Sequence, residues 1–212
     1  MARKSNSVKI ALFKLGHRDY EVRMRAVERL GVLLTENSAP RELIGMLEDN
    51  DDLVRVAAAE TLGRIGDREA LPDLWKAIND SSSLVRSYVA QAIGMLGDAA
   101  DAEKLVKRLK HERDTHSKMG IYEALYRLGD DRYLLKLIAL LKSRDYRIRC
   151  AVANALPTLL DDRSLAQFIL SILRGVMSKE PTIAAKSSMS SAIMCIDRYI
   201  KTRASESKRK GI

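Results

Sequence analysis

Three histidines, His17, His111 and His116, and two cysteines, Cys150 and Cys195, are the side chains of this 212-residue sequence best suited to metal binding or catalysis. The segment HERDTH does not place its two histidines one helical turn apart, as a zincin helix requires. The cysteines match no metal-ligand spacing and are too few for a disulfide framework, which favours reduced thiols inside the cell. These residues predict no catalytic site, no metal site and no cofactor, and we interpret HERDTH as a turn.

A column of basic residues is a second candidate for chemistry. Its members are Arg23, Arg55, Arg86, Lys118 and Arg149, at steps of 32, 31, 32 and 31 residues. Such a column could bind the phosphates of a nucleic acid. In four of the five cases an aspartate precedes the basic residue by four positions: Asp19, Asp51, Asp114 and Asp145. Because this spacing pairs opposite charges on a helix, we interpret the column as a structural ladder.

The ladder belongs to an internal repeat. The stretch LVRVAAAETLGRIGD, residues 53–67, returns 31 residues later as LVRSYVAQAIGMLGD, residues 84–98. A second apolar column keeps the same period at Leu43, Leu74, Leu105, Leu137 and Phe168. A sustained period of this length is typical of stacked structural repeats.

Each repeat is predicted to contain two helices. The aspartate three residues before the first apolar position is a typical N-cap, with Ser82 in the third repeat. Apolar residues follow at offsets 0, 4, 8 and 11, which is a helical stripe. A glycine in the left-handed conformation is expected to end the helix at Gly66, Gly97 and Gly129. The aspartates that follow these glycines are expected to begin the next helix.

These signals predict an all-α fold, a right-handed α-α superhelix (solenoid) of about five helix pairs with a C-terminal capping helix. We expect a basic segment at 1–9, one domain at 10–200 and a basic tail at 201–212. The predicted repeats are 17–47, 49–78, 80–109, 112–141 and 143–173, and the predicted cap is 182–199.

The pattern D-x-x-V-R-x-x-A-x-x-x-L-G-x-I-G-D, from residue 17 to about 175, resembles the HEAT-like repeat, particularly the short version in phycobilisome bilin lyases. The resemblance implies that the second helix of each pair lines a concave surface. It does not specify a function, because this fold hosts adaptors as well as enzymes. Deoxyhypusine hydroxylases of the same fold have several His-Glu pairs, whereas this chain has one.

The concave surface should consist of the positions opposite the apolar stripe. It is predicted to include Met24, Glu28, Val56, Glu60, Arg64, Ser87, Gln91, Met95, Met119, Glu123, Tyr126, Arg127 and Asn154. Glutamates repel phosphate, and methionines suit an adaptable protein-binding surface. Two internal ion pairs are expected, Glu60 with Arg64 and Glu123 with Arg127. The sequence gives no reason for the glycines that recur within the helices at Gly31, Gly63 and Gly94.

The formal net charge of +9 is concentrated at the ends of the chain. Residues 1–9 contribute +3 and residues 201–212 contribute +4, which leaves the body nearly neutral. No apolar run approaches the ~20 residues that span a bilayer, so we expect a cytoplasmic protein without membrane contact. The leading hypothesis is a non-enzymatic scaffold, of adaptor or inhibitor (immunity) type, that binds another protein through the concave face. The alternatives are a bilin lyase-like subunit that handles a tetrapyrrole, and a nucleic-acid binder that uses the basic termini.

Overall fold

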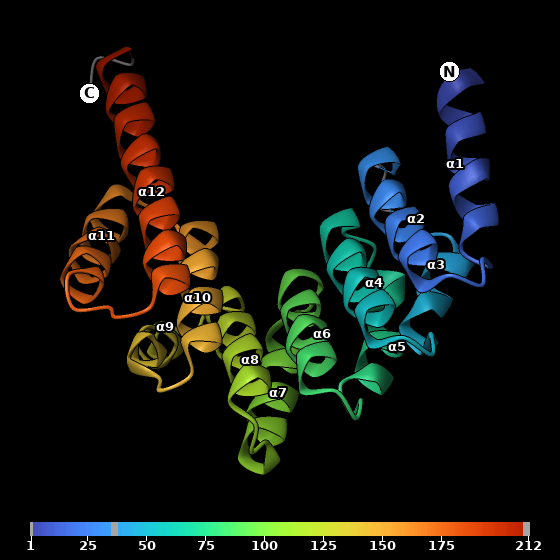
Figure 1. Cartoon of the computed structure of the whole chain (residues 1–212), viewed down its shortest axis with the longest axis horizontal. Helices are drawn as coiled ribbons and strands as arrows, with labels where there is room; N and C mark the ends of the chain where they lie inside the picture. The colour runs from blue at the N-terminus through green and yellow to red at the C-terminus, as the bar shows by residue number, and fades with distance from the viewer. Residues whose placement is uncertain (1, 35–37, 210–212) are drawn as a thin grey trace. The chain divides into compact units, whose positions relative to one another are not determined.

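The computed structural model describes residues 2–34 and 38–209. Every regular element within these ranges is a helix, which confirms the all-α prediction. The chain divides into two compact units, Met1–Leu134 and Leu135–Ile212 (Figure 1).

The first unit contains a row of helices that pack side by side. The row consists of α2 (Tyr20–Leu33), α4 (Asp52–Ile65), α6 (Ser83–Leu96) and α8 (Thr115–Arg127) (Figure 1). We refer to these four helices as the helix row. The remaining helices of this unit are α1 (Ala2–Lys14), α3 (Arg41–Gly45) with η1 (Met46–Glu48), η2 (Arg68–Ala70) with α5 (Leu71–Ala77), and α7 (Ala99–His111).

The second unit contains a long final helix. Its elements are η3 (Leu140–Lys142), α10 (Tyr146–Ala155), η4 (Leu156–Leu159), α11 (Arg163–Met177) and α12 (Ile183–Arg209), and α9 (Arg132–Ala139) includes the boundary. The buried stripe Ala185, Met189, Ala192 and Ile196 lies on α12, which packs on α10 and α11. Residues 201–209 of the predicted tail are therefore helical, and residues 210–212 lie outside the described part of the chain.

α1 was not among the predicted helices. Val8, Ala11 and Leu12 of α1 and Leu15 just after it recur at the spacing of one helix face. Ala11 and Leu15 belong to the core of the first unit, and Val8 and Leu12 pack against it. This signal was present in the sequence. It was missed because α1 lies before the first copy of the repeated line.

The four predicted aspartate N-caps are present. The side chains of Asp19, Asp51 and Asp145 each accept a hydrogen bond from the backbone two residues later. Asp114 accepts two bonds, from the backbone two and three residues later. These bonds satisfy amide groups that have no partner within the helix. Ser82 begins α6 without a side-chain cap bond.

All three glycines lie at the ends of helices, and two of them have the predicted left-handed conformation. Gly66 and Gly129 have positive φ angles of 83° and 98°. Gly97 is the C-cap of α6, as predicted, but it is not left-handed, because its φ is −78° and its ψ is −171°. A Cβ at Gly97 would lie 2.7 Å from the Ile93 carbonyl oxygen and 2.8 Å from the Asp101 carboxylate. Gly97 is therefore needed for space beside the capping box that begins α7.

Candidate functional site

The glycines within the helix row bring neighbouring helices into close contact. A Cβ at Gly94 of α6 would lie 2.5 Å from the Cα of Ala124 in α8. A Cβ at Gly63 of α4 would lie 3.1 Å from the Cα of Ala92 in α6. At Gly94 an added methyl group would require the backbones of α6 and α8 to move apart, and at Gly63 it would require a smaller shift of α6. The recurring glycines are thus explained by helix–helix packing rather than by chain flexibility.

At Gly31 and Gly63, a side chain of the following helix packs over the glycine. The guanidinium of Arg64 in α4 lies over Gly31 of α2, at 2.6 Å from the position a Cβ would take. The sulfur of Met95 in α6 lies 3.0 Å from the equivalent point at Gly63. Both side chains remain exposed to solvent. Arg64 and Met95 therefore form part of a surface that extends across α2, α4 and α6.

Most side chains of the predicted concave surface are accessible to solvent. We refer to those on the helix row as the row face. Glu28, Glu60, Arg64 and Met95 are exposed, and Met24, Val56, Gln91, Tyr126 and Arg127 are half-buried. Asn154 is exposed on α10, in the second unit.

Three predicted members of the surface are buried, and this is a correction. Ser87, Met119 and Glu123 are only 1%, 5% and 3% exposed. The cause is the close packing of α6 on α8, because a Cβ at Gly120 of α8 would collide with the backbone of Ser87. Sequence spacing gives the direction of a side chain, but it does not give the distance to the next helix. These residues are left out of the row face.

Glu123 is a buried carboxylate paired within its own helix. It accepts a hydrogen bond of 3.1 Å from the Arg127 guanidinium, as the sequence predicted. Burial raises the pKa of Glu123, and the neighbouring charge of Arg127 opposes this rise. Burial also raises the pKa of Tyr88 on α6, and the charges of Glu60 and Glu123 raise it further. The carboxylates of α4 and α8 therefore lie near a common tyrosine, which sequence spacing did not identify.

The second expected ion pair does not form. Among the ion pairs of the described residues there is none between Glu60 and Arg64, because the Arg64 side chain extends toward Gly31. Glu60 thus presents an uncompensated carboxylate on the exposed surface of α4.

The arginines of the ladder pair with residues other than those predicted. Arg23 bonds to Asp49 at 2.7 Å, Arg55 to Asp80 at 2.8 Å, Arg86 to Glu112 at 2.9 Å and Arg149 to Glu180 at 2.6 Å. The expected partners Asp19, Asp51 and Asp145 are engaged as N-caps instead. Asp49, Asp80 and Glu112 lie two residues before the N-caps Asp51, Ser82 and Asp114. Glu180 lies three residues before the start of α12. The ladder therefore links neighbouring repeats rather than stabilising single helices.

Every nitrogen of these guanidinium groups is occupied. The Nε and Nη2 atoms of Arg55 donate to Asp80, and its Nη1 donates to the carbonyl oxygen of Asp49 at 2.7 Å. Arg23, Arg86 and Arg149 repeat this arrangement with a carbonyl of their own loop. The geometry therefore favours the structural interpretation over a track of phosphate sites.

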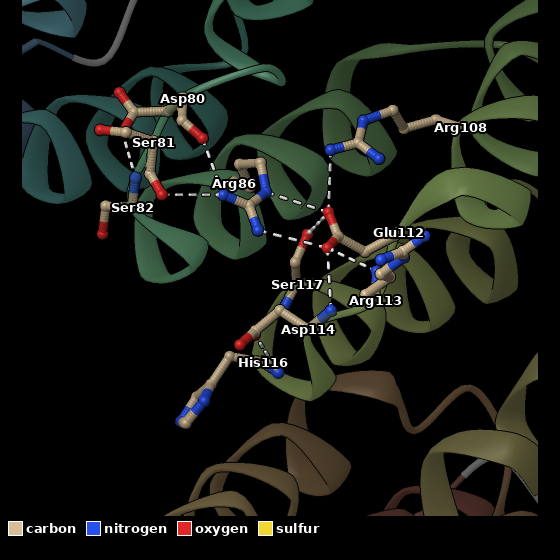
Figure 2. Close-up of polar contacts among 10 residues, drawn as sticks. All are labelled: Asp80, Ser81, Ser82, Arg86, Arg108, Glu112, Arg113, Asp114, His116 and Ser117. Atoms are coloured by element: carbon tan, nitrogen blue, oxygen red, sulfur yellow. Dashed lines mark hydrogen bonds and ion pairs between the residues drawn. The ribbon is translucent and has the colours of Figure 1, made fainter.

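Glu112 is the most highly bonded acid of the ladder (Figure 2). Its carboxylate accepts hydrogen bonds from Arg86, Arg108 and the Ser117 hydroxyl, and from the backbone of Arg113 and Asp114. Burial alone would raise the pKa of Glu112, but these bonds lower it to about 2. The HERDTH segment thus contains the turn between α7 and α8, as the sequence interpretation proposed. The structure adds that this turn is organised around the Glu112 carboxylate.

Lys118 is the exception in the ladder. Among the ion pairs of the described residues none involves Lys118. The loop position that is acidic in Asp49, Asp80 and Glu112 is occupied by Ser143 before the N-cap Asp145. The fourth position of the ladder therefore has a lysine in place of arginine and a serine in place of the acid.

No cluster of three potential metal ligands occurs among residues 2–34 and 38–209. In the same ranges no helix combines the length and the apolar character that crossing a bilayer requires.

Comparison with known proteins identifies the repeat. Residues 40–125 match the family model described as HEAT repeats. Among solved structures, the complex of CpcE and CpcF of phycocyanin lyase from Nostoc sp. PCC7120 has a similar fold, with a TM-score of 0.64 and 23% identity. The match covers 91% of this chain and 83% of that chain. No protein of curated function matches the sequence. The predicted resemblance to HEAT-like repeats is therefore confirmed.

Proposed function

We propose that this chain is a non-enzymatic protein-binding module whose row face contacts a partner protein. The observation that supports it most directly is the mixture of exposed apolar and acidic side chains on consecutive helices. Val32 and Met95 are 64% and 42% exposed, and they lie on the same helix row as the exposed carboxylates Glu28 and Glu60. Helical repeats commonly bind partners through extended surfaces of this kind.

The contacts within the row also support binding. Arginine–acid pairs and glycine contacts join α2, α4 and α6, and a preformed surface loses less conformational entropy when a partner binds. The chain would then act as an adaptor or as an inhibitor, since both roles require a preformed surface and no chemistry.

The test is a capture experiment with a charge-reversed row face. Tagged wild-type chain is used to capture proteins from its own cells, and a captured partner is purified. Its affinity is then measured for the double variant Glu28→Lys and Glu60→Lys. Both residues are exposed, so the fold should persist, and we expect affinity to fall at least about tenfold through lost electrostatic complementarity.

A matched control variant combines Glu69→Lys with Glu103→Lys. These glutamates are exposed on η2 and α7, outside the row face, and the total change in charge is identical. The control should retain wild-type affinity. If the partner binds both double variants with equal affinity, the row face is not the binding surface.

A second candidate function is that of a bilin lyase-like subunit. It is supported by the similar fold of the CpcE–CpcF complex, which extends over most of both chains. In this case the partner would be a pigment-accepting protein or a second lyase subunit. Co-expression with a bilin and an acceptor should then give an acceptor that stays coloured after denaturation. A colourless acceptor from cells that contain all the components would reject this candidate.

A further inference from the structure

The helices α1 and α2 lie side by side at the N-terminal end of the helix row (Figure 1). A groove of about 440 Å³ is lined by residues of both helices. Each helix contributes four residues at the spacing of one helix face. The lining residues are Ser7, Ile10, Ala11, Lys14, Val22, Arg25, Ala26 and Arg29. Ala11 and Ala26 are each 3% exposed and have small side chains, so they leave space between the two helices. We refer to this feature as the α1–α2 groove.

The groove has an exposed apolar wall. Ile10 lines the groove and is 49% exposed. Phe13 is not a lining residue, but it lies three residues after Ile10, which places it next to Ile10 on the surface of α1, and it is 87% exposed. Apolar side chains of this size gain free energy when a partner removes them from water. A cluster of them beside a groove with a charged rim is typical of an interaction site.

The rim of the groove is cationic. Lys14, Arg25 and Arg29 line it, and none of the lining residues is acidic. Arg25 bonds to Glu21 at 3.1 Å, but these side chains are 72% and 51% exposed, so this pair holds Arg25 only weakly. Among the ion pairs of the described residues none involves Lys14 or Arg29. Three positive charges are thus available around an apolar wall.

We propose that the α1–α2 groove binds an acidic amphipathic helix of a partner protein. The apolar stripe of such a helix would cover Ile10 and Phe13, and its flanking carboxylates would pair with the cationic rim. A nucleic-acid backbone would neutralise the cations but would leave the apolar wall exposed to water. The proposal is independent of the row face, because Met24 and Glu28 lie on a different stripe of α2 from the groove residues.

The test uses the full chain and a synthetic peptide of about 18 residues, or five helical turns. The peptide has leucine on one helical stripe and mainly glutamate elsewhere, and a fluorescent label reports binding by anisotropy. We expect saturable binding to the wild type. The triple variant Lys14→Gln, Arg25→Gln and Arg29→Gln should bind at least about tenfold more weakly.

The matched control neutralises Lys107, Lys110 and Arg113, three exposed cations of α7 and the loop after it. Each is replaced by glutamine, so the net charge changes equally, and affinity should stay at the wild-type value. The double variant Ile10→Ser and Phe13→Ser should also weaken binding, whereas a scrambled peptide of the same composition should not bind. Circular dichroism establishes that each variant remains folded.

Three results would overturn the proposal. The first is equal affinity of the groove and control variants for the peptide. The second is a single-stranded oligonucleotide of matched charge that binds more tightly than the peptide and loses affinity in the groove variant. The third is sedimentation showing that the chain dimerises and that groove substitutions, but not the peptide, dissociate the dimer.

Discussion

Gly94 lies within a helix, where alanine is ordinarily the more stable residue by about 1 kcal/mol. Its contact with the backbone of Ala124 reverses this preference, because an added methyl group would lie 2.5 Å from a backbone atom of α8. We expect Gly94→Ala to reduce the free energy of unfolding by about 1–3 kcal/mol, the usual cost of overpacking. Urea denaturation followed by circular dichroism measures this change.

Gly175 is the matched control for this substitution. It lies in α11 with no atom within 4 Å of the position of an added Cβ. Gly175→Ala should therefore stabilise the chain by about 0.5–1 kcal/mol. If Gly94→Ala is as stabilising as Gly175→Ala, the helices α6 and α8 do not lie as close together as described.

At the scale of single helices, the N-caps give a second comparison. Asp51 caps α4 through a bond of 2.9 Å from the Leu53 amide, whereas Ser82 begins α6 without a side-chain cap bond. Asp51→Ala should cost about 1 kcal/mol of stability, and Ser82→Ala should cost clearly less. Thermal or urea unfolding of the two variants checks this order, and a reversed order would contradict it.

Helices and caps could be predicted from the sequence because their signals are local. The bond from Asp51 to the Leu53 amide spans two residues, and the left-handed Gly66 directly follows the helix it ends. The arginine partners could not be predicted in this way, because Arg23 and Asp49 are 26 residues apart. The prediction chose the nearest acid along the helix, which was already occupied as a cap.

The predicted exposure of the surface side chains was correct where neighbouring helices leave room and wrong where they do not. Glu28 and Glu60 are exposed as expected, whereas Glu123 occupies the equivalent position on α8 and is buried. Periodicity assigns the three glutamates the same direction. The difference arises from the packing around α8, and the meaning of Gly94 and Gly120 became clear only from the position of the neighbouring helix.

At the scale of the whole molecule, the lowered pKa values of two carboxylates in the ladder predict that the stability of the fold decreases at low pH. The pKa of Glu180 in the second unit is lowered to about 2 by the hydrogen bond from Arg149, against burial, and the pKa of Glu112 in the first unit is also about 2. Both values lie below the ordinary 4.5. The folded state therefore favours the ionised form, and this stability is complete above about pH 4.5 and is lost as the pH falls toward 2.

Urea unfolding at a series of pH values tests this dependence. The free energy of unfolding should decrease from pH 4.5 to pH 2.5 in the wild type. Glu112→Gln should be less stable at neutral pH and should show a shallower decrease, because one of the acids with a lowered pKa is absent. An unchanged slope in Glu112→Gln would show that Glu112 does not contribute to the acid sensitivity.

The division into two units predicts that the first unit folds without the second. Buried residues from Ala11 to Tyr133 form one apolar cluster, and three arginine–acid pairs of the ladder lie within the same part of the chain. A fragment of residues 1–144 keeps α9 and η3 whole and has the size of an ordinary domain. We expect it to be helical and to unfold cooperatively in urea.

The substitution Gly94→Ala should destabilise this fragment as much as it destabilises the full chain, because both sides of that contact lie in the first unit. A fragment that unfolds without a cooperative transition would mean that the core of the first unit depends on residues after 144.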